Sequence, residues 1–196
     1  MNIEICRLKP ELAEDYVDFF DTTPHDTNID AHKCYCVCWC NDEYEGKDFS
    51  TAEKRRQYAL HYVRQNNIQG YLVYIDGKVV GWCNANTKSE CLKCASWTRF
   101  MDYVPLDDIH SGVKVKSVFC FVIAPEMKRK GIATSLLERV CDDALQDGFD
   151  FVEAYPFKTS AYQSSDFGGY IEMYQKNGFY ISSDTDKGIV MRKQLK

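Results

Sequence analysis

A short basic turn stands between an apolar segment and an amphipathic segment, and its residues could bind an anion. Three basic residues and a glycine make up this turn: Lys128, Arg129, Lys130 and Gly131. If a helix begins here, its first N–H groups lack partners within the helix and carry partial positive charge, so they bind phosphate well. Gly131 and Ala133 would leave room for a bulky anion near the backbone. A basic turn that only faces solvent would have the same composition, so the turn alone leaves both readings open.

Two groups of cysteines could bind a metal or undergo redox chemistry. Four alternate along one segment and two form a C-x2-C pair: Cys34, Cys36, Cys38, Cys40, Cys91 and Cys94. In an extended segment the alternating thiols would project to one face, where His32 could join them as a zinc ligand. Structural zinc sites usually use two separated pairs, so the spacing favours small buried side chains over ligands. We therefore expect no metal site, while a redox role for the C-x2-C pair stays open.

Hydrophobic periodicity and turn signals predict a mixture of helices and strands. Alternating or dense apolar runs predict strands over residues 2–7, 70–75, 78–83, 113–123, 149–155, 179–183 and 189–194. Apolar residues at helical spacing predict helices over residues 10–20, 50–65, 132–146 and 170–177. Asp76-Gly77 indicates a tight hairpin turn, and Ser50 with Glu53 is typical of a capping box. The order of elements predicts an α+β fold, with a hairpin first and a strand–helix–strand unit later.

Length and composition are typical of a folded globular chain. With 45% hydrophobic and 27% charged residues in 196, the sequence argues against disorder and predicts one domain over residues 1–196. No apolar run approaches the roughly 18–20 residues that cross a bilayer, and the first residues lack a secretory signal, so we expect a cytoplasmic protein without a membrane partner. The net charge is -5 and Lys and Arg are not clustered, which argues against nucleic-acid binding.

Two motifs, in this order, resemble those of the GNAT superfamily of N-acetyltransferases. The family's acetyl-coenzyme A motif is Arg or Gln, two residues, Gly, one residue, then Gly or Ala. Lys128, Gly131 and Ala133 stand at these positions, with Lys in place of Arg or Gln. Downstream, Tyr174 followed after three residues by Gly178-Phe179 is similar to a second family motif.

The resemblance implies a fold, a cosubstrate and a set of binding residues. The fold would be a mixed, mostly antiparallel sheet of six to seven strands flanked by about four helices, with two strands parting to form a cofactor slot. Acetyl-coenzyme A would be the cosubstrate, and the acceptor a primary amine of a small molecule or a protein. The pyrophosphate and its surroundings would be bound by Lys128, Arg129, Lys130, Gly131, Ile132, Ala133 and Thr134. The pantetheine arm would meet backbone groups of Phe121, Val122 and Ile123. The resemblance also allows a homodimer.

Direct attack of an amine on a thioester needs a base, an oxyanion donor and an acid. By resemblance, Tyr174 lies near the sulfur, where a phenol can protonate the departing thiolate. A backbone N–H of the slot strand, such as that of Val122, could hold the oxyanion. Some relatives carry a base early on that strand, but Lys116 and Ser117 occupy the region here. Glu153 and Tyr155, on the next strand, are therefore candidate bases, alone or through water, although for Glu153 a solvated strand residue would fit the pattern as well.

Two other classes of function remain open from the sequence. One is a non-catalytic module that binds acyl-coenzyme A, and the other is a metal or redox sensor built on the cysteines. Residues 22–46 and 90–111 match no motif, so we expect the choice of acceptor to reside there, with Tyr35 and Trp39 as possible walls of the acceptor pocket.

Overall fold

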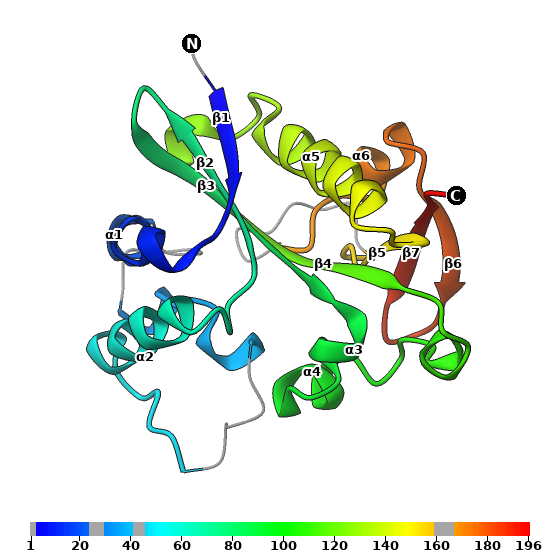
Figure 1. Ribbon diagram of the computed structural model, residues 1–196, viewed down its shortest axis with the longest axis horizontal. Coiled ribbons are helices and arrows are strands. Elements are labelled where there is room, and N and C mark those ends of the chain that lie inside the picture. The colour runs from blue at the N-terminus through cyan, green and yellow to red at the C-terminus, as the bar shows by residue number, and fades with distance from the viewer. Residues whose placement is uncertain (1–2, 24–29, 41–45, 159–166) are drawn as a thin grey trace.

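A seven-stranded sheet organises the computed structural model, which describes residues 3–23, 30–40, 46–158 and 167–196. The strands are β1 (Ile3–Arg7), β2 (Gly70–Ile75), β3 (Lys78–Thr87), β4 (Val115–Ile123), β5 (Phe151–Ala154), β6 (Tyr180–Asp184) and β7 (Ile189–Gln194). Their order across the sheet is β1-β2-β3-β4-β5-β7-β6 (Figure 1). Of these pairings only β4 with β5 is parallel, which confirms the expected mixed, mostly antiparallel sheet.

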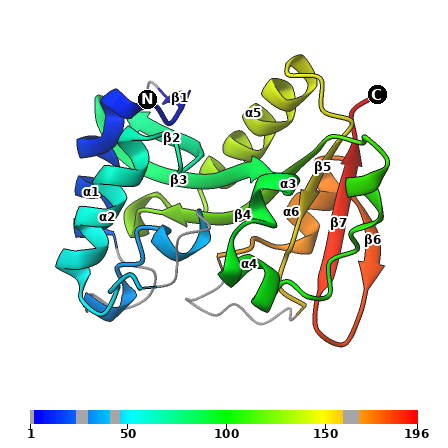
Figure 2. The same cartoon turned by 60° about the horizontal axis from the view of Figure 1, so that its bottom comes forward.

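Helices cover both faces of this sheet. The α-helices are α1 (Ala13–Thr22), α2 (Ala52–Arg64), α3 (Lys88–Cys91), α4 (Ala95–Phe100), α5 (Ile132–Gln146) and α6 (Ile171–Lys176), and short 3-10 helices include η3 (Val37–Trp39) and η4 (Asp107–His110). Two more α-helices are described than the four expected, because α3 and α4 fold from a stretch without clear periodicity. Figure 1 shows α5 and α6 on one side of the sheet and α1 and α2 on the other, and Figure 2 shows α3 and α4 beside β4. No helix among the described residues is long and apolar enough to span a bilayer.

Neighbouring residues of β3 show how the two faces are filled. A Cβ on Gly81 would lie 3.0 Å from the side chain of Ile123 and 3.3 Å from that of Ile132 of α5, so a larger residue here would require these side chains to shift. Trp82 points to the opposite face, where its ring packs edge-on against Tyr16 of α1 with centroids 4.8 Å apart. Both contacts bury apolar surface, which is the main force that holds helices to a sheet.

Local signals place several elements as predicted, with one change. Asp76 and Gly77 have positive φ values of 51° and 78°, as a tight hairpin turn between β2 and β3 requires. Helix α2 begins one residue later than the Ser50 capping box predicts. Thr51 is its N-cap, and the Thr51 side chain accepts a hydrogen bond from the Lys54 N–H at 3.2 Å.

The centre of β4 carries an extra residue, and β4 then separates from β5. Opposite β3, Cys120 faces Asn84 and Val118 faces Ala85, so Phe119 is an unpaired bulge residue. The parallel pairing with β5 ends at Val118. Because the two strands part there, the outer edge of β4 is open from the bulge onward, as the predicted slot requires.

A buried carboxylate ties α5 to the first two strands. Asp143 accepts hydrogen bonds from Arg7 Nε at 2.7 Å, Arg139 Nε at 2.8 Å and Tyr71 Oη at 3.1 Å. Burial opposes ionisation, but the hydrogen bonds from Arg139 and Arg7 outweigh it and lower the pKa of Asp143. The lowered pKa means that the ionised form stabilises the fold above the ordinary pKa near 3.9 and that this contribution is lost as pH falls below it.

We expect Asp143→Asn to lower the free energy of unfolding at pH 7 by about 1.5–3 kcal/mol, because bonds to a charged acceptor are lost. Urea denaturation measures this. The gap between wild type and variant should shrink below about pH 4, first because Asp143 of the unfolded chain becomes protonated and then, at lower pH, because the folded carboxylate does. Asp142→Asn, at the exposed neighbouring position, should stay within about 0.5 kcal/mol of wild type at both pH values. A pH-independent gap for Asp143→Asn would contradict the assignment.

Candidate active site

The amino end of α5 presents unpaired backbone donors to solvent. Gly131 is the N-cap with φ of 82°, and the first bond of the helix runs from the Ser135 N–H to the Gly131 oxygen at 3.0 Å. The N–H groups of the three residues between them therefore lack partners within the helix. Arg129 also has a positive φ of 62°, and alternating left-handed residues turn successive N–H groups toward one point. Lys128, Arg129 and Lys130 are exposed around this end, so the arrangement suits an anion.

A groove runs from this helix end along α6. Its volume is about 370 Å³, and its walls are Thr134 of α5 and, at α6, Tyr170, Glu172, Met173, Lys176 and Asn177. Of these residues the sequence singled out only Thr134. The others had no signal except their position in the helix of the second motif.

Only every second residue of β4 directs its backbone N–H and C=O groups to the open edge. The Ala124 N–H bonds to the Val80 oxygen of β3 at 2.9 Å, and backbone direction alternates along an antiparallel strand. The groups of Val122 therefore point toward β3, opposite Trp82, while those of Phe121 and Ile123 point to the open edge. This geometry corrects the expectation for Val122, whose N–H is directed away from the slot. The backbone groups of Phe121 and Ile123 face the slot.

A segment before α6 fills the space between the parted strands. The Phe121 N–H donates to the Phe167 oxygen at 2.7 Å, and the Tyr174 hydroxyl donates to the next carbonyl, that of Gly168, also at 2.7 Å. A Cβ on Gly168 would lie only 2.5 Å from the backbone carbonyl oxygen of Tyr155, just after β5, so no larger residue fits. Two consecutive carbonyls thus bring the Phe121 N–H and the Tyr174 hydroxyl to one place. Phe167 and Gly168 were not predicted as site residues.

Tyr174 is fully enclosed. Its exposed fraction is 0%, and its ring packs edge-on against Phe179 with centroids 5.3 Å apart. Burial raises the pKa of Tyr174 well above that of a free phenol, so the hydroxyl keeps its proton at neutral pH. The side chain is therefore a hydrogen donor in this site.

Glu153 is buried in a network of charges, which rules out the solvated reading. Its exposed fraction is 0%, and its carboxylate accepts from Lys88 Nζ at 2.9 Å, Arg192 Nε at 2.7 Å and Tyr155 Oη at 2.8 Å. Two cations around one carboxylate would be excessive, but Arg192 also pairs with Asp108. The cluster therefore holds two carboxylates and two cations, and this balance of charge limits the free-energy cost of burying them.

Tyr155 connects this network to β4. Its hydroxyl lies 3.0 Å from the Ser117 hydroxyl as well as bonding to Glu153. Burial, followed by the nearby Glu153 charge, raises the pKa of Tyr155 well above its ordinary value. Tyr155 immediately follows β5, so its hydroxyl lies next to the point where β4 and β5 part.

The cysteines do not line one extended segment. Tyr35 and Cys36 both have positive φ, 48° and 50°, and a 3-10 turn follows, so the alternation of side chains is broken. Hydrogen bonding to the Cys36 thiol, then burial, raises the pKa of both Cys34 and Cys120, which places Cys36 between them. On the other side of the loop, the Cys94 thiol contacts the Cys38 oxygen at 3.1 Å. Within the described ranges no group of three or more His, Cys, Asp or Glu side chains is arranged to hold a metal.

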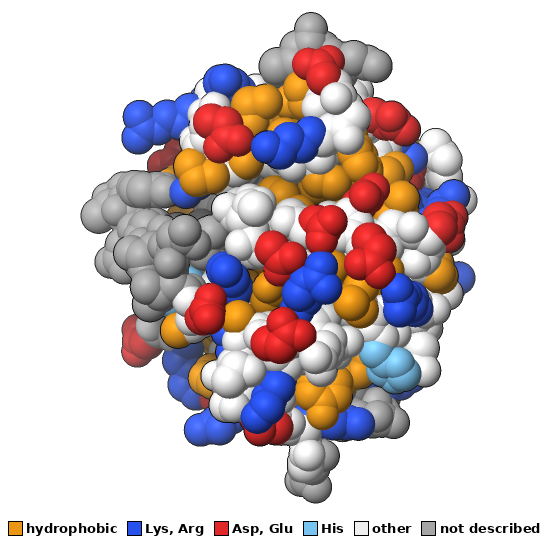
Figure 3. Space-filling model, turned by 90° about the vertical axis from the view of Figure 1, so that its left-hand side faces the viewer, with side chains coloured by type: hydrophobic (Ala, Val, Ile, Leu, Met, Phe, Trp, Pro, Cys, Tyr) orange, Lys and Arg blue, Asp and Glu red, His pale blue; other side chains and the backbone are white. Residues whose placement is uncertain are grey.

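Charges of both signs are mixed over the face drawn in Figure 3. Acidic and basic side chains alternate there, between apolar patches, with no continuous field of one sign.

Comparison with known proteins places this arrangement in a family. Solved structures of the same fold include the PaiA N-acetyltransferase of Thermoplasma acidophilum in complex with coenzyme A (15% identity, 99% of each chain covered, TM-score 0.54). Others are YncA of Salmonella typhimurium with acetyl-CoA (14% identity, 99% of this chain and 94% of that one, TM-score 0.54) and arylalkylamine N-acetyltransferase 2 of Aedes aegypti (13% identity, 100% of each, TM-score 0.58). A search of curated proteins returns no significant match. The model of the acetyltransferase (GNAT) family matches residues 35–179, well over half of the sequence, and the chain therefore belongs to this family.

Proposed function

We propose that the protein transfers the acetyl group of acetyl-coenzyme A to a primary amine of a small molecule or a protein. The observation that carries the proposal is the combination of two features at one end of the sheet. Strand β4 parts from β5 after Val118, and α5 begins nine residues beyond Ile123. Coenzyme A complexes of family members with this fold support acetyl-coenzyme A as the donor.

Three groups of residues would each bind a different part of the cofactor. The N–H groups of Ile132, Ala133 and Thr134, with the basic turn, would hold the pyrophosphate. The open edge at Phe121 and Ile123 would hold the pantetheine arm, and the groove beside α6 would accept the rest of the cofactor. Lys128 at the usual Arg or Gln position adds positive charge, while the main contacts come from backbone.

Two donors would act on the thioester. The Phe121 N–H would bond to the thioester oxygen and stabilise the oxyanion that forms when the amine attacks. The Tyr174 hydroxyl would then protonate the departing thiolate, because a phenol kept neutral by burial has a proton to give. Both donors now bond to the carbonyls of Phe167 and Gly168, so acetyl-coenzyme A has to take their place.

Proton removal from the amine would run through Tyr155 to Glu153. Glu153 has no exposed surface, so it reaches a substrate only through Tyr155, whose hydroxyl already donates to it. As the phenol oxygen accepts a proton from the ammonium formed on attack, its own proton passes to the carboxylate. Glu153 is then the acceptor of the relay and Tyr155 the group that touches the substrate.

Transfer would be direct, without an acetylated cysteine. Cys120 is the thiol next to Phe121, but contact with Cys36, then burial, raises its pKa well above the ordinary value. A thiol that stays protonated is a poor nucleophile. A cytoplasmic location and a homodimer remain part of this proposal, and binding of acyl-coenzyme A without turnover would favour the non-catalytic alternative.

Acetyl-coenzyme A should stabilise the purified protein by about 2.7 kcal/mol at a hundredfold excess over its Kd, measurable as a rise in melting temperature. Gly131→Val should weaken binding by about tenfold or more, because a β-branched residue disfavours the positive φ that aims the amides. Gly148→Val, which strains a glycine with φ of 78° just beyond the other end of the same helix, is the matched control and should keep wild-type affinity. Equal affinity of the two variants would argue against the helix site.

Tyr174→Phe should lower kcat by about 100-fold through loss of the acid, with the acetyl-coenzyme A Kd within about twofold of wild type. Steady-state kinetics and calorimetry measure the two quantities. Tyr180→Phe, at an exposed position on β6, should leave both unchanged. Wild-type turnover in Tyr174→Phe would refute the role.

Tyr155→Phe and Glu153→Gln should both displace the basic-side rise of the pH–rate profile, because each interrupts the relay. Glu153→Gln should also lower the free energy of unfolding by about 3 kcal/mol or more, since Lys88 and Arg192 lose their shared counterion. Glu138→Gln, exposed on α5, should change neither quantity. Unshifted profiles in both relay variants would remove Glu153 and Tyr155 from the reaction.

A further inference from the structure

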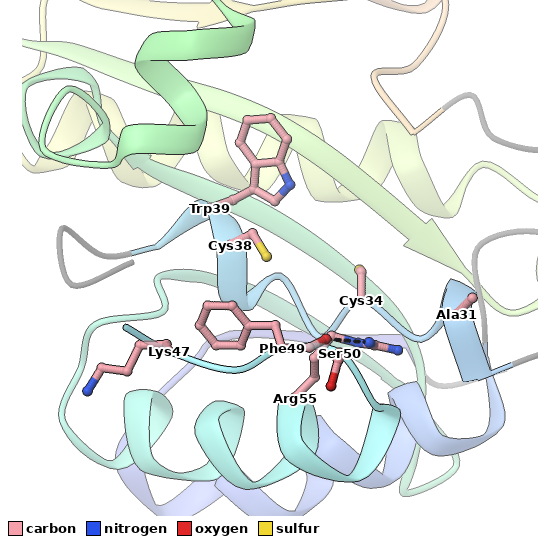
Figure 4. A pocket seen from close by; sticks show the side chains of 8 residues that line it. All are labelled: Ala31, Cys34, Cys38, Trp39, Lys47, Phe49, Ser50 and Arg55. Carbon is pink, nitrogen blue, oxygen red and sulfur yellow. Dashed lines mark hydrogen bonds between the residues drawn. The ribbon is translucent and has the colours of Figure 1, made fainter. Parts of the chain in front are cut away.

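A second pocket lies on the other face of the sheet, between η3 and α2. Its volume is about 460 Å³, within the usual range for small-molecule sites. Figure 4 shows the side chains that line it: Ala31, Cys34, Cys38, Trp39, Lys47, Phe49, Ser50 and Arg55. The walls are mostly apolar, and the charged members are both cations.

Arg55 gives this pocket a buried positive charge that has no carboxylate partner among the described residues. Its exposed fraction is 8%, and its guanidinium donates to three backbone oxygens: those of Lys33 at 2.8 Å, Phe49 at 2.7 Å and Asp30. None of the ion pairs between described residues includes Arg55. Carbonyls satisfy hydrogen bonds but carry no net charge, and two of the five N–H groups of the guanidinium remain. A buried, incompletely used cation in a cavity suits an anionic ligand.

The pocket adjoins the place where acetyl transfer is proposed. Trp39, one of its walls, packs against Phe119 of the β4 bulge in a tilted arrangement, with ring centroids 4.2 Å apart. Phe119 lies two residues before Phe121, whose N–H would hold the thioester oxygen. Cys34, another wall, contacts Cys36. Cys36 in turn contacts Cys120, which lies on β4 next to Phe119. The indole of Trp39 thus stands between Arg55's pocket and β4.

We propose that this pocket selects the acceptor by its carboxylate. The acceptor is a small amino acid in which an apolar spacer separates the amine from the carboxylate. The carboxylate bonds to Arg55, the spacer lies along Trp39 and Phe49, and the amine reaches the β4 bulge. Lys47 also lines the pocket, and the positive charge of Arg55 disfavours polyamines. This inference rests on the proposed acetyl transfer and names the acceptor class for that reaction.

Matched acceptor pairs test the proposal on the wild-type protein. 6-Aminohexanoate is compared with hexylamine, and lysine with cadaverine, by thiol release from acetyl-coenzyme A. We expect kcat/KM to be at least about tenfold higher for the carboxylate member of each pair, as a charge-assisted bond to a buried arginine implies. Equal or faster acetylation of hexylamine and cadaverine would overturn the proposal.

Variants at adjacent positions of α2 separate recognition from general effects. Arg55→Gln should reduce the preference to about twofold or less while acetyl-coenzyme A affinity stays unchanged. Arg56→Gln is the matched control, because Arg56 pairs with Asp18 and Asp21 away from the pocket, and it should keep the wild-type preference. If Arg55→Gln does not fold, Lys47→Gln replaces it and should lower the preference by a smaller factor.

The outcomes distinguish this proposal from the one on which it rests. Acetyl transfer without a carboxylate preference, or a preference that survives Arg55→Gln, overturns the acceptor assignment alone. Absence of acetyl-coenzyme A binding and of transfer to any amine overturns the proposed function as well.

Discussion

Beyond Val118 none of the described strands pairs with the outer edge of β4, and backbone groups left there need other partners. This parting of β4 and β5 is the constraint on which the site depends. It exposes Phe121 and Ile123 as an edge that another chain of amides can join, and it opens the space into which Tyr174 points its hydroxyl. The same strand leads directly into the turn that begins α5, so the anion site lies at one end of the slot.

Much of the framework follows from local sequence signals. Helix α5 spans the residues that its periodicity predicts, and the Asp76-Gly77 turn forms the predicted hairpin, because both depend on neighbours in the chain. The surroundings of the candidate base were harder to predict. Glu153 has the pattern of a half-exposed strand residue, and its burial depends on Lys88 and Arg192, which come from elements distant in sequence. Similarly, the direction of the Val122 backbone follows only from the register with β3 and the bulge at Phe119.

The cysteine segment shows how backbone conformation can override a side-chain pattern. An alternating run predicts one face only if the chain is extended. Two successive left-handed residues, Tyr35 and Cys36, turn the chain, and the thiols separate into different surroundings. Left-handed tyrosine and cysteine are uncommon, so no propensity would predict them. Their tolerance rests on tertiary contacts, such as the bond from the Tyr16 hydroxyl to the Tyr35 oxygen at 2.9 Å.

The paired carbonyls of Phe167 and Gly168 have a consequence for the resting state. They keep the Phe121 amide and the Tyr174 phenol oriented and dehydrated before any thioester arrives. In the proposed reaction the Phe121 N–H would exchange the Phe167 oxygen for the thioester oxygen, and the Tyr174 hydroxyl would exchange the Gly168 oxygen for the thiolate sulfur. Both donors are already bonded to protein oxygens in the free protein, so water would not have to be expelled from them when a thioester binds.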